Sequence, residues 1–375
     1  MIELQGILKK YGKDFLENHK LSYDQTKAFR AILNCRTAAL GGHADTCDEC
    51  GFQRISYNSC RNRNCPKCQT FAKEQWIEKQ NESLLNVGYF HIVFTLPDKL
   101  NTLVYQNQAL VYNLFFKAMS ETLLELGLDE KYLGAKLGIT AVLHTWGQNL
   151  LYHPHIHCII PGGGITADGK WVYSRKKFFM PVKVLSKKFR GKFLFYLKRA
   201  KLCFYSNIKY LENPREFDAF ISNLYQKDWI VYCKPPFKNA TKVVEYLGRY
   251  THRVAISNNR ILKAENGYIT FKWRDYRDSS KSKTMTVTAD EFIRRFMLHI
   301  LPSGFCKIRH YGILASRNKI ERIRLCKKLT NTQVFPTKNK TVLEKLKDIL
   351  GKDFNQCPCC GIGNLSRAPP EIQTA

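Results

Sequence analysis

Hydrophobic and polar positions along the chain predict helical and extended segments in a mixed order. Residues 1 to about 34 and 71–87 have the apolar spacing of amphipathic helices. Residues 89–96 (YFHIVFTL) form an apolar run ended by Pro97, which predicts a strand, and a helical stretch follows at about 99–126. Residues 138–150 and 155–160 are predicted to form a hairpin of the main sheet, stopped by the sequence Pro-Gly-Gly-Gly.

The second half of the chain continues this mixture. Residues 175–210 are helical in pattern and very basic, a strand is expected at 229–233, and a helix at about 240–250. Sequence pattern then predicts short strands near 254–257, 268–273 and 283–288, a basic helical region from about 289 to 350, and a cysteine-rich tail.

These elements predict an α+β fold with a central antiparallel sheet flanked by helices. A small zinc-ribbon-like domain is expected before it, because residues 35–70 are rich in Cys, Asn and Arg and lack the apolar residues for a core of their own. The expected organisation is a helical segment (1–34), the zinc-binding segment (35–70), a catalytic domain (71–300), and a basic C-terminal region with a cysteine-rich tail (301–375).

Charge indicates the class of partner. Lys and Arg outnumber Asp and Glu by 60 to 31, which gives a formal net charge of +29. Such a surplus favours a polyanionic partner, and nucleic acid is the first candidate. A membrane partner is not expected, since the sequence shows neither an amphipathic anchor helix nor an apolar span of about 20 residues.

The fourteen cysteines point to metal binding. The N-terminus lacks the pattern of a secretory signal, so a cytoplasmic, nucleoid-associated protein with reduced thiols is expected. Cys47-Asp-Glu-Cys50 and Cys65-Pro-Lys-Cys68 are two Cys-x-x-Cys knuckles at a spacing that predicts one structural zinc site with four thiolates. Three neighbours, Cys35, His43 and Cys60, leave two alternatives open: a swap of one ligand, or a second metal ion.

The loop between the two knuckles carries Arg61 and Arg63 among amide side chains. A metal-stiffened loop of this composition suits contacts to phosphates and bases, although a purely structural staple is an equal alternative. Farther on, Cys357 and Cys360 form half of a zinc site, which would have to borrow a ligand from Cys326, Cys359 or His310, or else bind no metal.

His153-Pro-His155-Ile-His157 is the most informative stretch of the chain. Alternate side chains of a strand share a face, so His155 and His157 should project together and hold a divalent cation with open coordination positions. A third ligand is expected from the adjacent strand, where Gln148 is preferred over His144. His153 is expected at most to bind a phosphate or to lie in the outer shell of the site.

Tyr246 and Tyr250 lie four residues apart, on one face of the predicted helix. An arbitrary tyrosine pair at this spacing is usually part of a core, but Arg249, Arg253 and a nearby metal would favour the phenolate and make both hydroxyls nucleophiles.

Three segments together resemble a known family, the rolling-circle insertion-sequence transposases of the HUH endonuclease class, two-tyrosine type (insertion sequence 91 family). The segments are 58–69 (NSCRNRNCPKCQ), 153–164 (HPHIHCIIPGGG) and 246–257 (YLGRYTHRVAIS), and residues 309–314 and 357–363 are also similar. The resemblance covers most of the chain, including an N-terminal transposase zinc-binding domain.

The resemblance implies an HUH nuclease-like domain with the metal histidines on a middle strand of the sheet and the tyrosine helix beside them. It gives His155 and His157 the role of metal ligands and Tyr246 and Tyr250 the role of nucleophiles, one for each strand transfer. A polar third ligand on the neighbouring strand is typical of related nickases, which favours Gln148. The implied cofactors are structural Zn²⁺ and catalytic Mg²⁺ or Mn²⁺, and the implied partners are single-stranded DNA at the element's ends and target DNA.

Three alternatives remain at this stage. A plasmid replication initiator or a conjugative relaxase would use the same chemistry for another purpose. A zinc-dependent DNA-binding protein would use the histidines and tyrosines structurally and form no covalent adduct. A metal-dependent hydrolase is less favoured, because the sequence has no His-Glu-x-x-His pattern and no obvious general base.

Overall fold

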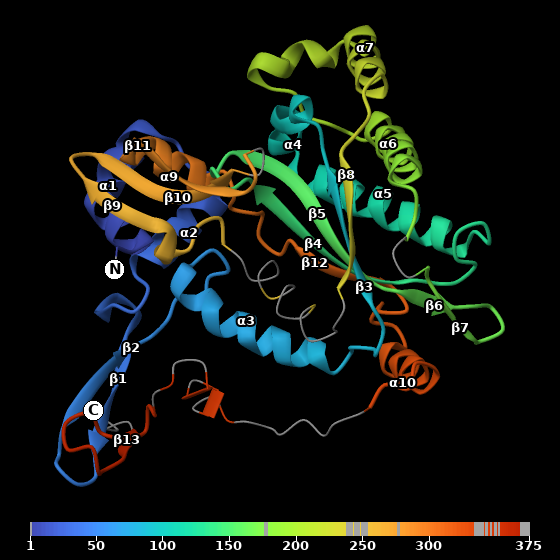
Figure 1. Cartoon of the computed structure of the whole chain (residues 1–375). Helices are drawn as coiled ribbons and strands as arrows, with labels where there is room; N and C mark the ends of the chain where they lie inside the picture. Colours follow the sequence, from blue (N-terminus) through green and yellow to red (C-terminus); the bar gives the residue numbers. More distant parts are fainter. Residues whose placement is uncertain are drawn as a thin grey trace, which may run out of the picture.

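The computed structural model describes residues 2–175, 179–237, 243, 248, 254–275, 278–333, 341, 344–345, 347–348, 351 and 353–367. A five-stranded, wholly antiparallel sheet lies at its centre in the order β12-β4-β5-β3-β8 (Figure 1). Its strands are β3 (Tyr89–Thr95), β4 (Gly138–Trp146), β5 (Tyr152–Pro161), β8 (Val231–Phe237) and β12 (Ile308–Gly312). The predicted α+β class and the hairpin of β4 and β5 are confirmed.

One face of this sheet packs on helices. Alternate residues of the three inner strands, Phe90 to Phe94, Ile139 to Leu143 and Ile156 to Ile160, point into the main core. The helices that cover them are α4 (Asn101–Gln106), α5 (Gln108–Leu128), α6 (Val182–Lys198) and α7 (Pro214–Tyr225). Because strand side chains alternate, the residues between these core positions, His91 and His157 among them, must lie on the opposite face.

A second lobe combines the start of the chain with residues far along it. Helices α1 (Leu4–Asn18) and α2 (Tyr23–Leu33) share a core with the sheet β11-β10-β9 and with α9 (Ala289–Met297). The strands are β9 (Ile261–Glu265), β10 (Tyr268–Asp275) and β11 (Lys281–Thr288). Phe271 and Phe292 are fully buried and pack against each other, with ring centroids 5.8 Å apart.

The cysteine-rich segment projects from the body of the molecule (Figure 1). It contains the hairpin of β1 (Gly42–Cys47) and β2 (Gln53–Tyr57), and strand β13 (Leu365–Arg367) of the tail adds to β1, so both ends of the chain contribute to one small sheet. Helix α3 (Pro66–Asn81) then leads back to the central sheet, and β6 (Gly163–Ile165) and β7 (Trp171–Tyr173) form a separate hairpin.

Several predicted boundaries differ from the structure. Residues 254–257 form no strand, although Val254, Ala255 and Ile256 are buried. The region predicted to be helical from about 289 to 350 begins with helix α9 but contains β12 between α9 and α10 (Lys319–Leu329), because residues 308–312 pair with β4 at the edge of the sheet. The predicted helix at 240–250 lies outside the described residues except Val243 and Gly248, which have helical backbone. Across the described residues, no helix is both long and apolar enough to span a bilayer.

Candidate metal centre and cysteine clusters

Four histidines gather on the face of the central sheet opposite α5 and α6, and three of them form a closer group beside His91 of β3. His155 and His157 lie on β5, the central strand, and His144 lies directly opposite His155 on β4. One ligand nitrogen from each of these three side chains lies within 4.8 Å of the others, a spacing at which one cation can bridge them. The sequence prediction that His155 and His157 share a face is confirmed.

The third member of the group differs from the one preferred in the sequence. Strand β4 ends at Trp146, so Gln148 lies in the turn before β5, whereas His144 remains in register with His155. Gln148 lines the same cavity, and its backbone oxygen accepts a hydrogen bond from Arg260. His153 lies at the start of β5, partly exposed, with its Nδ1 3.5 Å from Asp98 Oδ1.

Hydrogen bonds orient the two β5 histidines. His155 Nδ1 lies 2.7 Å from the backbone oxygen of His153 and donates to it, which directs Nε2 away from the backbone. His157 Nδ1 lies 2.9 Å from Nε2 of His91, a buried residue of β3. Burial lowers the pKa of His91 to about 3, with nearby Lys234 and His155 acting in the same direction, so this imidazole is neutral at pH 7.

His91 was not identified as a site residue from the sequence. It lies in an apolar strand, and a polar side chain within such a strand is the only signal that could have marked it. The structure places it diagonally across β3 and β5 from His157, since Val93 is the direct partner of His157.

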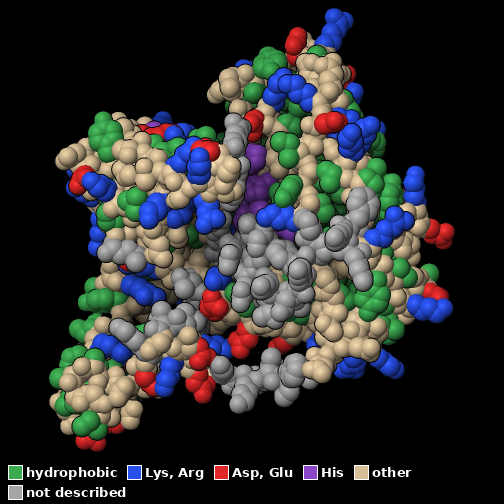
Figure 2. Space-filling model, viewed as in Figure 1, with side chains coloured by type: hydrophobic (Ala, Val, Ile, Leu, Met, Phe, Trp, Pro, Cys, Tyr) green, Lys and Arg blue, Asp and Glu red, His purple; other side chains and the backbone are tan. Residues whose placement is uncertain are grey.

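The histidines form the floor of a cavity of about 650 Å³. Figure 2 shows them in a hollow between the lobe of β9–β11 and the central sheet. Trp146 stacks on His144 with ring centroids 4.6 Å apart, and β8 contributes Tyr232 and Lys234 to the wall. No carboxylate belongs to the described lining, so the ligands offered to a cation are imidazoles and neutral oxygens such as the amide of Gln148.

The nucleophile candidates Tyr246 and Tyr250, together with Arg249 and Arg253, lie outside the described residues. Two residues close to them in sequence, Val243 and Gly248, are described. Val243 is buried against Tyr89 and Ile159, which belong to the histidine face of the sheet. A Cβ atom at Gly248 would lie 2.2 Å from Ile77 Cδ1 on α3, so a larger residue there would force the Ile77 side chain to move.

The knuckle cysteines form two clusters rather than one. Cys65 and Cys68 lie with Cys35 and Cys60, whereas Cys47 and Cys50 lie with the tail residues Cys357 and Cys360. The prediction of a single site from Cys47, Cys50, Cys65 and Cys68 is therefore wrong, because the β1–β2 hairpin carries the first knuckle away from the start of α3.

Sulfur distances in the two clusters are alike. Cys35 Sγ lies 3.6 Å from Cys68 Sγ and 3.7 Å from Cys65 Sγ, and Cys60 Sγ lies 3.6 Å from Cys68 Sγ. All fourteen cysteines are free thiols, and within each cluster the four sulfur atoms lie within 4.8 Å. Both sets therefore fit a tetrahedral metal site.

The remaining residues considered as ligands lie elsewhere. Cys326 is buried against Leu85 and Ile313, and His310 Nδ1 lies 3.1 Å from Thr140 Oγ1. His43 faces Asp45, with Nε2 3.7 Å from Oδ1, and Cys359 is exposed. Neither cluster includes any of them.

The two arginines of the knuckle loop have different surroundings. Arg61 is exposed. Arg63 is half-buried, and its Nη1 donates to the backbone oxygen of Phe305 at 2.6 Å. Arg61 is therefore the more accessible of the two to a nucleic acid.

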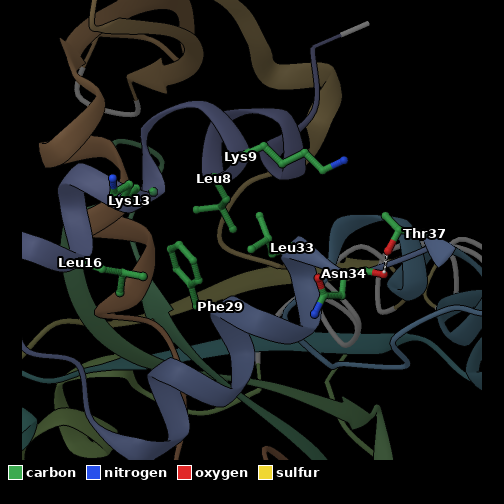
Figure 3. Close-up of a pocket in the computed structure, with 9 residues that line it drawn as sticks. Leu8, Lys9, Lys13, Leu16, Phe29, Leu33, Asn34 and Thr37 are labelled. Carbon is green, nitrogen blue, oxygen red and sulfur yellow. Dashed lines mark hydrogen bonds between the residues drawn. The ribbon is translucent and has the colours of Figure 1, made fainter. Parts of the chain in front are cut away.

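A second hollow, of about 540 Å³, lies between α1 and α2 (Figure 3). Leu8, Leu16, Phe29 and Leu33 line it, and the exposed Lys9 and Lys13 lie at its rim. It brings together no histidine, cysteine or carboxylate. The histidine cavity is therefore the better candidate for chemistry.

Fold and site together define an antiparallel-sheet protein with a histidine centre on its middle strand and cysteine clusters suited to zinc. Two known protein-family models match parts of this chain. Residues 7–96 match the family model described as "Transposase zinc-binding domain", and residues 138–321 match the one described as "Putative transposase".

Two relatives match nearly the whole chain. A protein of Sinorhizobium fredii named "Putative transposase y4qJ" is 46% identical over 373 residues, which cover 97% of this chain and 94% of the relative. The "Transposase for insertion sequence element IS801" of Pseudomonas savastanoi pv. phaseolicola is 28% identical over 353 residues, 92% of this chain and 84% of the relative. No solved structure matches. The chain belongs to the insertion sequence 91 family of transposases.

Proposed function

We propose that this transposase nicks and joins single-stranded DNA through a 5′-phosphotyrosine intermediate, in rolling-circle transposition. The observation that carries the proposal is the convergence of His144, His155 and His157 at the floor of a cavity in a chain of this family. We assign these three side chains as ligands of a catalytic divalent cation, with Gln148 beside them on the cavity wall.

The donor set fits such a cation. Three neutral imidazoles are common ligands of divalent transition metals, and the cavity leaves room for a phosphate. When bound, the cation would polarise the scissile phosphate and offset negative charge in the transition state. Lys234, which is paired across the sheet with His91, adds positive charge to the same wall.

Tyr246 and Tyr250 are the proposed nucleophiles. The described residues nearest to them in sequence support this assignment: Gly248 packs on α3, and Val243 packs on the histidine face of the sheet.

Each of the two strand transfers forms one ester bond to phosphorus and breaks one, so neither needs an external energy source. In the first, a tyrosine oxygen attacks the phosphorus, the bond to the 3′ oxygen breaks, and the phenolic proton ends on the released 3′-hydroxyl. In the second, a DNA 3′-hydroxyl attacks the phosphotyrosine, which restores a phosphodiester and the free phenol. Carboxylate-assisted hydrolysis of DNA is less well supported, because the described cavity lining has no Asp or Glu.

The test uses the purified full-length protein and labelled single-stranded oligonucleotides from the ends that flank its gene. With Mg²⁺ or Mn²⁺ we expect nicked DNA and a denaturant-resistant adduct, both lost with EDTA and with the His155→Ala/His157→Ala variant. His19→Ala is the control, since His19 bonds to Asp290 in the other lobe. Tight DNA binding without nick or adduct in either metal would instead support a zinc-dependent DNA-binding protein without catalysis.

A further inference from the structure

The two ends of the chain meet at four cysteines. Cys47 and Cys50 belong to the end of β1 and the turn after it, and Cys357 and Cys360 lie just before β13. Cys47 Sγ lies 3.8 Å from Cys360 Sγ, and Cys50 Sγ lies 3.7 Å from Cys357 Sγ. The family match to the zinc-binding domain ends at residue 96, so half of this cluster lies outside it.

The spacing of the four sulfurs fits a zinc ion. Four thiolates at a Zn–S distance of about 2.3 Å form a tetrahedron with edges of about 3.8 Å. Backbone amides point at the tail sulfurs, as they do in metal knuckles: Cys359 N donates to Cys357 Sγ at 3.4 Å, and Gly363 N donates to Cys360 Sγ at 3.3 Å.

The surrounding module is too small to hold itself together by apolar packing. Its buried residues are Cys47, Cys357 and Leu365, with Phe52 and Cys360 partly buried against them. Strand β13 pairs with β1 over only three residues, from Cys47↔Leu365 to Asp45↔Arg367. Small domains with cores of this size depend on metals or cross-links for stability.

Polar contacts align the tail on the hairpin. Asn364 N donates to Asp48 Oδ1 at 2.7 Å in an exposed contact, and Arg54 Nη1 donates to the backbone oxygen of Phe354 at 3.2 Å in a partly buried one. Such contacts near the surface contribute little to stability but fix the register of the two segments. They bring the two knuckles face to face.

We propose that Cys47, Cys50, Cys357 and Cys360 bind one structural zinc ion that ties the C-terminal tail to the N-terminal zinc-binding domain. The ion is separate from the one that Cys35, Cys60, Cys65 and Cys68 are placed to bind, which needs only the N-terminal part of the chain. The β1–β2 hairpin therefore supplies only two of the four zinc ligands, and the tail supplies the other two. The ion thereby cross-links two segments about 300 residues apart in the sequence.

Zinc content of full-length variants tests the shared ion. Cys47→Ser/Cys50→Ser and Cys357→Ser/Cys360→Ser should each lose about one zinc per chain, and all four substitutions together should still lose only about one. Cys203→Ser/Cys306→Ser is the matched control, because both cysteines are exposed and belong to neither cluster. Unchanged zinc content in the tail variant, or a loss of about two ions in the fourfold variant with normal folding by circular dichroism, would overturn the proposal.

Thiol alkylation gives a local readout that does not depend on total zinc. Cys50 and Cys359 are both exposed, but only Cys50 belongs to the cluster. Cys50 should react at least about tenfold more slowly than Cys359 until a chelator is added, and Cys357→Ser/Cys360→Ser should abolish this protection. Equal reaction of the two thiols in the native protein, or a disulfide between the knuckles, would refute a shared zinc ion.

Discussion

His91 Nε2 and His157 Nδ1 lie 2.9 Å apart across β3 and β5. A neutral imidazole carries one N–H, so the direction of this hydrogen bond decides which nitrogen of His157 keeps a lone pair for a cation. If His157 Nδ1 donates to His91 Nε2, the lone pair is on His157 Nε2. We propose this direction, in which His91 is a positioning residue that selects the metal-binding tautomer of the proposed ligand His157.

Substitution of His91 should weaken the metal centre without removing a ligand. His91→Leu deletes the acceptor and should lower Mn²⁺ affinity by about 10–100-fold. His91→Gln supplies an amide oxygen as acceptor and should recover part of this loss. Calorimetric titration of each variant with Mn²⁺ measures the effect. Equal affinities for the two variants and the wild type would show that the hydrogen bond plays no part in metal binding.

His144 and Gln148 offer a direct contrast. If His144 is the third ligand, His144→Ala should reduce metal affinity by more than the 10–100-fold typical of an outer partner, and Gln148→Ala should reduce it by less. The same titration, with nicking rates measured at saturating metal, separates the two. A larger loss of metal affinity in Gln148→Ala than in His144→Ala would instead identify Gln148, which the sequence favoured, as the third ligand.

The histidine pair could be predicted because it depends on local geometry alone. Side chains two residues apart on a strand share a face, so His155 and His157 project together. The partner on β4 depends on strand register, which a bulge between His144 and Trp146 and the length of the turn decide. That information does not reside in any short motif. The sequence therefore could not show that His144, rather than Gln148, lies opposite His155.

The cysteines show the limit of spacing arguments. Two Cys-x-x-Cys knuckles close in sequence fit one zinc site as well as two half-sites, and nothing local distinguishes these cases. The second halves come from Cys35 and Cys60 on one side and from a tail about 300 residues away on the other. Long-range pairing of this kind follows from the packing of whole segments. The only indication of it in the sequence is the isolated Cys-x-x-Cys knuckle at Cys357 and Cys360.

The main core should depend strongly on Phe189. Its ring lies 5.0 Å from Phe94 and 5.5 Å from both Phe115 and Trp229, and it is fully buried. Phe189→Ala should cost about 3–5 kcal/mol of unfolding free energy, through lost contacts and a cavity under the sheet. Phe195→Ala on the same helix is the control, since Phe195 is 49% exposed. Urea unfolding compares the two, and similar losses would contradict the packing described.

Glu291 should make stability depend on pH. Hydrogen bonds from Arg294, and also from Arg295, lower the pKa of this carboxyl from 4.5 to about 2, against the effect of burial. A lowered folded-state pKa contributes stability above the unfolded value, and that stability is lost as pH falls toward 2. Glu291→Gln should therefore cost about 1–2 kcal/mol at pH 7 after allowance for solvent screening, and progressively less below about pH 5. Unfolding by urea at several pH values measures the gap, which a purely steric effect would leave constant.

The most direct test of the catalytic proposal is to identify the tyrosine in the covalent adduct. The adduct formed with single-stranded DNA and Mn²⁺ would be digested and mapped by mass spectrometry, alongside Tyr246→Phe, Tyr250→Phe and the double variant. Tyr232→Phe is the control, because Tyr232 lines the histidine cavity without being a proposed nucleophile. The account predicts a nucleotide on Tyr246 or Tyr250, and adduct yield in the double variant below about one-thousandth of the wild type. A nucleotide on Tyr232, or an adduct that persists in the double variant, would contradict it.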